Sequence, residues 1–199
     1  MGISKDLNLG PNGISDLATL FAAALLIFEV PNGTSTHSHT YNVQLSPTIT
    51  VYALQMFPAA KWLGANVILW GIATAAGAAA TNYGTFLVSR IFLGIFEATI
   101  GPSLLLISSQ WYTKSEQGPR FSFWYLGLGL GQIIGGLVSY GFQHMGPDAK
   151  LSGWRTMFLV LGCVTVVIGI LTFILLPDTP MKARWLSDGE KVALLMSKL

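Results

Sequence analysis

One apolar stretch, from Phe86 to Trp111, constrains the fold of this chain more than any other feature. It is long enough, at about 1.5 Å per residue, to cross a bilayer core of roughly 30 Å as a helix. It nevertheless contains Arg90 and Glu97. An ionisable residue at membrane depth costs about 2.5–3.5 kcal/mol on insertion scales and therefore needs a partner or a wet cavity. We expect these two residues, about two turns apart with Gly94 between them, to lie near one face of a membrane helix.

The composition places the whole chain in a membrane. Of its 199 residues 52% are hydrophobic and only 10% are charged, whereas soluble domains carry about 25% charged residues. The single cysteine, Cys163, excludes an intramolecular disulfide and is more typical of a small packing residue than of a reactive thiol. We therefore predict an integral membrane protein in contact with lipid, with no cofactor and no nucleic-acid partner.

Five apolar segments are candidates for membrane helices, and together they predict an all-α membrane protein. The first is short for a span. We predict transmembrane helices at residues 14–30, 61–81, 86–111, 121–142 and 154–176. Around them we expect an N-terminal polar loop at 1–13, an atypical polar insert or cytoplasmic loop at 31–60, a short charged loop at 113–120 and a cytoplasmic tail at 177–199.

The segment between the first two predicted helices has an unusual composition. Residues 31–57 are rich in Ser and Thr, carry no charged side chain and alternate weakly in the manner of a strand. His37 and His39 suggest a metal site, but two histidines without a nearby Cys or carboxylate are more often simply solvated. We therefore expect no metal site here.

Glycines recur along the predicted helix at 121–142. Gly127, Gly131 and Gly135 stand four residues apart, and Gly136 follows directly. Such a stripe lets a neighbouring backbone approach closely.

The positive charges suggest an orientation. They gather after the third predicted helix, in the C-terminal tail and just before the second helix. The positive-inside rule then places the tail in the cytosol and the N-terminus outside. The chain start lacks a cationic region that would mark a signal peptide, so we expect that a preceding span is missing.

Several motifs occur in an order that resembles a known family. The predicted third helix carries R-x-x-x-G-x-x-E-A at Arg90, Gly94, Glu97 and Ala98. The fifth begins with G-W-R at 153–155 and ends with P-D-T-P at 177–180, and the first ends with F-E-V-P-N at 28–32. Together these motifs resemble the major facilitator superfamily, and within it the fungal anion:cation symporters of the allantoate and nicotinate permease group.

The resemblance implies a partial N-terminal helix bundle. The five predicted spans correspond to family helices 2 to 6, while helix 1 and helices 7 to 12 are absent. Residues 33–54 resemble no family element, so this segment is either intron sequence read through by the gene model or a mark of a degenerate gene.

The resemblance also implies a function, namely a proton-coupled permease for small organic anions in the plasma membrane. Arg90 is then a cationic group near the cavity, and Glu97 a carboxylate that takes up the coupled proton. The alternative for both residues is a purely structural pairing or the anchoring of neighbouring helices. Gln132 is a candidate either for contacting substrate or for an interhelical hydrogen bond. The glycine stripe is either a plain packing seam or a seam that slides during a transport cycle.

The alternative for the chain as a whole is a non-transporting membrane fragment or interaction protein. The missing helices or second half would be needed for transport. No nucleophile motif, metal cluster or phosphate-binding loop in the sequence favours an enzyme.

Overall fold

The computed structural model describes residues 3–7, 10, 12–29, 56–144, 151–183, 186–187 and 189–192, and within these ranges it contains helices and no strand. The helices are α1 (Ile3–Asp6), α2 (Gly13–Glu29), α4 (Ala59–Ala78), α5 (Tyr83–Glu97), α6 (Ile100–Trp111), α7 (Lys114–Gln143), α8 (Gly153–Leu175) and the 3-10 helix η1 (Pro180–Lys182). The two histidines of the polar insert, His37 and His39, and the segment at 33–54 lie outside the described residues.

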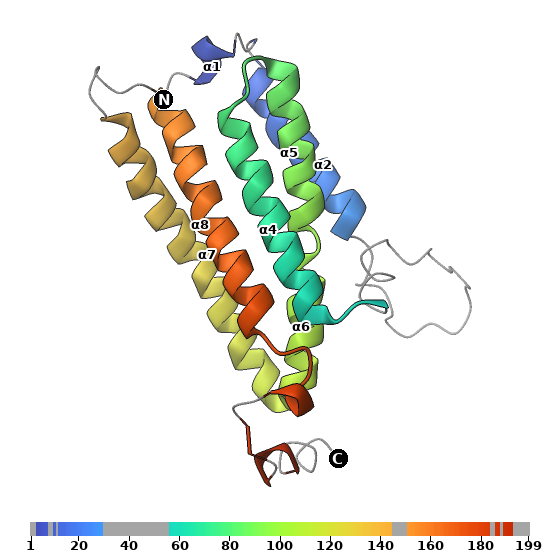
Figure 1. Cartoon of the computed structure of the whole chain (residues 1–199). Coiled ribbons are helices and arrows are strands. Elements are labelled where there is room, and N and C mark those ends of the chain that lie inside the picture. The colour runs from blue at the N-terminus through green and yellow to red at the C-terminus, as the bar shows by residue number, and fades with distance from the viewer. Residues whose placement is uncertain are drawn as a thin grey trace.

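The long helices form a bundle in which they run along one common direction (Figure 1). Contacts lead from α7 to α8, from α8 to α4, from α4 to α5 and α6, and from α5 to α2. The helix α1 lies at the end of the bundle where α8 begins, and η1 lies at the opposite end. This arrangement confirms the predicted all-helical membrane fold.

Among the described residues, three helical stretches are long and apolar enough to cross a membrane by length and composition. They are Tyr83–Trp111, which comprises α5 and α6, Ser115–Gln143 in α7, and Gly153–Leu175, which is α8. The apolar helix Gly13–Phe28 is shorter. The 20 residues of α4 are rich in Ala and Gly and include Lys61 and Asn66. The helix α4 packs against α5, α6 and α8, and the residues that it buries include Gly64, Asn66 and Gly71. Small and polar residues of this kind are favoured where membrane helices pack closely together. The set of five membrane spans stays a prediction.

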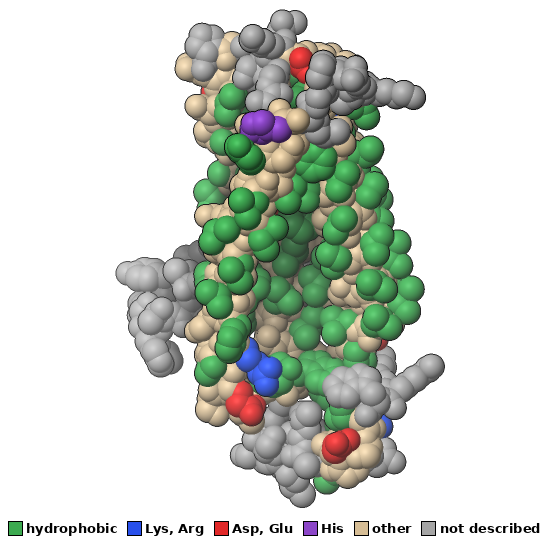
Figure 2. Space-filling model, turned by 90° about the vertical axis from the view of Figure 1, so that its left-hand side faces the viewer, with side chains coloured by type: hydrophobic (Ala, Val, Ile, Leu, Met, Phe, Trp, Pro, Cys, Tyr) green, Lys and Arg blue, Asp and Glu red, His purple; other side chains and the backbone are tan. Residues whose placement is uncertain are grey.

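The surface of the bundle supports a membrane setting. Figure 2 shows one face on which hydrophobic side chains extend along most of its length, while the coloured charged side chains lie towards the two ends. Large apolar residues are exposed on several helices, among them Ile134 on α7, Ile174 on α8 and Ile27 on α2. An apolar surface of this extent is stable in lipid but would aggregate in water.

The predicted helix at 86–111 is interrupted after Glu97. The helix α5 ends there and α6 begins at Ile100, with Ala98 and Thr99 between them. The physical cause is Pro102, which has no N–H to offer to the carbonyl of Ala98 four residues earlier and clashes with it. The chain therefore continues as a kinked helix of 29 residues, Tyr83–Trp111.

The charged segment at 113–120, predicted as a loop, instead forms the first turns of α7. Thr113 and Glu116 form a capping box in which the Thr113 backbone N–H donates to the Glu116 carboxylate over 3.1 Å. This motif satisfies backbone donors that are otherwise unpaired at a helix start. It therefore allows the helix to begin at Lys114, before the apolar sequence does.

The tightest packing in the bundle joins α4 and α8 through glycines. A Cβ added to Gly71 would lie 2.7 Å from the backbone N of Val166, and one added to Gly162 would lie 2.6 Å from the backbone N of Ala75. Gly64 on α4 and Gly169 on α8 face the opposite backbone at similar distances. Real Cβ atoms essentially never come this close. We call these four glycines the α4–α8 seam.

Basic residues fasten both ends of this helix pair. Lys61 at the start of α4 donates a hydrogen bond to the carbonyl of Phe173 near the end of α8. Arg155 at the start of α8 donates to the carbonyl of Ala80, just beyond the end of α4, over 2.9 Å. Each cation thus satisfies a carbonyl near a helix C-terminus, where a positive charge is favoured.

The glycines predicted to serve helix packing have different surroundings. Gly94 is buried against α2, where an added Cβ would lie 3.0 Å from the carbonyl oxygen of Phe21. A Cβ on any of the α7 glycines would meet nothing within 4 Å among the described residues; these are Gly127, Gly131, Gly135 and Gly136. Their packing role stays a prediction.

We predict that Gly162→Val strongly destabilises the folded chain, because the new side chain collides with the backbone of α4. Overpacking of this kind costs about 1–3 kcal/mol or more. Thermal unfolding of the purified chain in detergent micelles measures the effect. The matched control is Gly131→Val on the open face of α7, which we expect to change the unfolding midpoint little. Equal midpoints for the two variants would contradict the seam.

Candidate functional site

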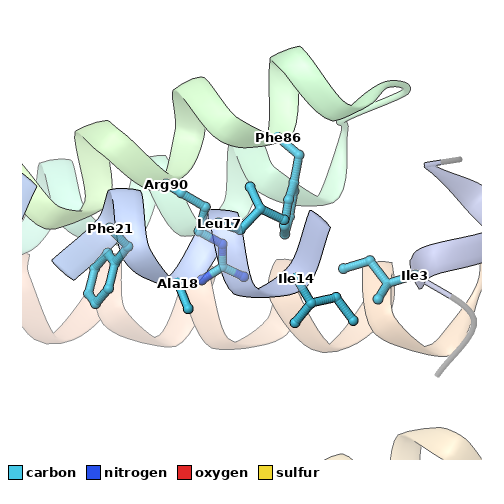
Figure 3. Close-up of a pocket in the computed structure, with 7 residues that line it drawn as sticks. All are labelled: Ile3, Ile14, Leu17, Ala18, Phe21, Phe86 and Arg90. Carbon is cyan, nitrogen blue, oxygen red and sulfur yellow. The ribbon is translucent and has the colours of Figure 1, made fainter. Parts of the chain in front are cut away.

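The candidate site is a cavity of about 300 Å³ between α1, α2 and α5. Figure 3 shows the side chains that line it, which are Ile3, Ile14, Leu17, Ala18, Phe21, Phe86 and Arg90. Six of these seven described residues are apolar, and Arg90 is the only charged one. The cavity thus presents one fixed positive charge to a largely apolar chamber.

Arg90 reaches the cavity from α5, towards Leu17 and Ala18 on α2 (Figure 3). Its guanidinium carbon lies 4.7 Å from the ring centroid of Phe86 and also 4.7 Å from that of Phe158 on α8. A ring face attracts a cation by about 0.5–1 kcal/mol when exposed and about 2 kcal/mol or more when desolvated. These two contacts offset part of the cost of holding the charge at this depth.

A third ring completes this aromatic cluster. Trp154 is 1% exposed and lies edge-on to Phe86, with ring centroids 6.0 Å apart, and to Phe158, with ring centroids 6.2 Å apart. Phe86 and Phe158 are edge-on to each other at 5.9 Å. Edge-to-face pairs at these separations are attractive and fix the angle of each ring. The cluster therefore gives the two rings around Arg90 a defined orientation.

The other predicted site residues lie elsewhere. Glu97 is half-buried at the last position of α5, next to the break before α6, and does not line the Arg90 cavity. Gln132 is exposed on α7, which contacts α6 and α8, and it is absent from the cavity lining too. The structure thus does not gather the three residues around one chamber. Their functional roles stay predictions.

The chemistry of this site is recognition rather than bond making. A guanidinium keeps its charge at any physiological pH and donates a fork of hydrogen bonds that matches a carboxylate. Its apolar surroundings strengthen such a contact, because the local dielectric is low. The described residues contain no group of three or more His, Cys, Asp or Glu side chains placed to hold a metal ion.

Sequence reasoning identified Arg90 but missed the rings that hold it. Phe158 lies in an apolar run where many residues look alike, so nothing local distinguishes it. Trp154 stands in the G-W-R motif, and that motif was the one signal that pointed towards this region. Phe86 precedes Arg90 by four residues, which places the two on one helix face.

We predict an energetic coupling between Arg90 and Phe158. Arg90→Lys keeps the charge but loses the planar stacking group, and Phe158→Leu keeps apolar volume but loses the ring. In a double-mutant cycle of thermal or denaturant unfolding, the coupling should be about 0.5–2 kcal/mol. Phe92→Leu on the exposed side of α5 is the control, and it should add to Arg90→Lys without coupling. Strict additivity in both cycles would refute the aromatic sandwich.

Comparison with known proteins identifies the family. The sequence model of the Major Facilitator Superfamily matches residues 1–198. A thiamine pathway transporter of Saccharomyces cerevisiae is 41% identical over 192 residues, which are 96% of this chain and 33% of that protein. The allantoate permease of the same yeast is 38% identical over 133 residues, 66% of this chain and 24% of that protein. A major facilitator-type transporter of Emericella nidulans is 30% identical, covering 96% and 36%.

These matches confirm the family resemblance that the sequence motifs indicated. They also place the chain among transporters rather than enzymes. The chain spans about a third of the length of the curated relatives it matches. It is similar along nearly its whole length to fungal membrane transporters. The chain belongs to the major facilitator superfamily.

Proposed function

We propose that the chain is part of a proton-coupled permease for small organic anions. The observation that carries this proposal is the cavity of about 300 Å³ in which Arg90 is the only charged residue among the described lining residues. An isolated guanidinium among apolar walls favours a ligand with one anionic group on a compact organic body. Such sites fix a ligand with a few polar groups and enclose the rest in apolar surface.

The relatives support the direction of this proposal without giving the substrate. One is named for allantoate and another for the thiamine pathway. Both names concern small organic solutes. In the proposed cycle Arg90 pairs with the anionic group as the two halves of a complete transporter rock about a midplane site.

Glu97 is the proposed proton-coupling residue. It stands half-buried at the break between α5 and α6, in a segment that is apolar enough to cross a membrane. Ionisable residues inside membrane segments commonly mark proton relays and ion pathways. Gln132 is a weaker candidate for substrate contact, because it lies on α7 and away from the Arg90 cavity. The plasma membrane and a cytoplasmic C-terminal tail complete the proposal.

We expect the counterpart of Glu97→Gln in a full-length relative to uncouple transport from protons, because glutamine cannot exchange a proton. Uptake of radiolabelled allantoate by the yeast allantoate permease, measured with and without an imposed pH gradient, tests this. The variant should lose the dependence on the gradient, and the counterpart of Arg90→Lys should keep that dependence while raising KM. Unchanged gradient dependence in the glutamine variant would remove the coupling role.

A second candidate function is a non-transporting membrane protein. It is favoured by the exposure of α7, since the most apolar part of Ser115–Gln143 is 0% buried. An uncovered apolar helix surface of this kind is typical of a site that contacts another protein or lipid.

We therefore predict no uptake by the 199-residue chain alone. The purified chain in liposomes, with an inward proton gradient, should accumulate allantoate no faster than empty liposomes do. The full-length allantoate permease in the same vesicles is the positive control. Uptake above the empty vesicles would reject the second candidate and show that these helices suffice.

A further inference from the structure

The short helix α1 is linked to the start of α8 by one hydrogen bond. The indole Nε1 of Trp154 donates to the Asp6 carboxylate over 2.8 Å, across 148 residues. Leu7, 3% exposed, inserts beside Leu17, 7% exposed, in the same core cluster as Trp154. Figure 1 shows α1 at the end of the bundle where α8 begins. The contact thus joins the first described helix to the last long one.

This hydrogen bond leads directly to the candidate site. Trp154 packs edge-on against both rings that enclose Arg90. From the same short helix as Asp6, Ile3 lines the Arg90 cavity (Figure 3). The helix α1 therefore touches the cavity in two ways, by covering one end of it and by holding the aromatic cluster.

We propose that α1 is a latch. When the bond between Asp6 and Trp154 is made, Ile3 covers one end of the Arg90 cavity, Leu7 packs in the core cluster, and Trp154 holds the rings of Phe86 and Phe158 in place. When the bond opens, α1 leaves the bundle end, and the cavity and Leu17 become accessible to water from that end. Asp6 and Trp154 are positioning residues in this device, not ligands of the transported solute.

The strength of this bond suits a latch. Asp6 is solvent-exposed, so water competes for its carboxylate, and one net hydrogen bond shifts an equilibrium by about two- to tenfold. A contact of that strength holds α1 closed and still permits frequent opening. A fully buried ion pair would not, because separating it leaves an uncompensated charge.

The ionised form of Asp6 stabilises the closed state. The hydrogen bond from Trp154 holds the pKa of the Asp6 carboxyl below its usual value, and the hydrogen bond from Ser152 and the charge of Arg155 act in the same direction. Because this pKa is depressed, the bond stabilises the closed latch fully at pH values above the ordinary pKa of a carboxyl group. That contribution is lost as the pH falls through the lowered pKa. At neutral pH the latch is therefore at full strength.

The latch proposal rests on the proposed function only in taking the Arg90 cavity as an anion-binding site. Its test involves no transport. The reporter is Leu17→Cys, made together with Cys163→Ser because Cys163 is exposed. The purified chain in lipid nanodiscs reacts with a water-soluble maleimide, and the labelling rate at position 17 is measured at pH 7. Asp6→Ala and Trp154→Phe should each raise the rate about two- to tenfold.

The double variant carrying Asp6→Ala and Trp154→Phe should label no faster than the faster single variant, because both changes remove the same bond. Two matched controls keep the parent rate. Asp16→Ala removes an exposed carboxylate from the first turn of α2. Trp70→Phe removes an indole whose buried Nε1 has no hydrogen-bond partner among the described residues. Single variants at the parent rate, multiplicative effects in the double variant, or equal acceleration by the controls would each overturn the latch.

A second measurement avoids the reporter in case the Leu17 substitution prevents folding. Backbone hydrogen exchange of residues 3–7 and of the first turn of α2 is compared between the native chain and Asp6→Ala. We expect about two- to tenfold faster exchange in the variant. Unchanged exchange there would overturn the proposal. If the labelling and exchange tests contradict the latch, the proposed anion site is unaffected. If the uptake test in the full-length permease fails, the proposed function is overturned and the latch proposal still stands.

Discussion

The structure depends first on the close approach of α4 and α8. Four glycines, Gly64, Gly71, Gly162 and Gly169, bring the two backbones to distances that no side chain would permit. Lipid chains are as apolar as leucine, so helices in a membrane gain nothing from simple hydrophobic burial. They associate instead through van der Waals packing and backbone proximity. The pair formed in this way carries α7 on one side and α5 with α2 on the other, and it fixes where the two sides of the Arg90 site meet.

The site follows from that placement, since Arg90 comes from α5 and one of its two rings comes from α8. The helix α4 lies between these elements and packs against both. A shift of α8 along α4 by one residue would move Phe158 by about 1.5 Å and weaken its contact with the guanidinium. The hydrogen bond from Arg155 to the carbonyl of Ala80 lies at the same end of the bundle as Phe158, and it opposes that shift.

The sequence predicted the all-helical fold because apolar run length is a local property. Three features were not predicted. The break after Glu97 was missed, although the effect of Pro102 on the preceding turn is local. The charged start of α7 was interpreted as a loop, although Thr113 and Glu116 form a capping box. The seam between α4 and α8 was not recognised, because its glycines stand seven residues apart and only the partner helix distinguishes them from the closer-spaced, open glycines of α7.

The partners of Arg90 and Asp6 were beyond the reach of sequence reasoning for another reason. Phe158 and Trp154 are distant in the chain, and a charge inside an apolar segment predicts only that some partner exists. A carboxylate partner would have cancelled the charge of Arg90, whereas the faces of Phe86 and Phe158 attract the guanidinium without neutralising it. Aromatic packing therefore lowers the cost of placing the cation beside the cavity and leaves its positive charge in place. Stabilising a charge is therefore different from neutralising it, and only stabilisation is compatible with a cavity whose described lining carries a single cation.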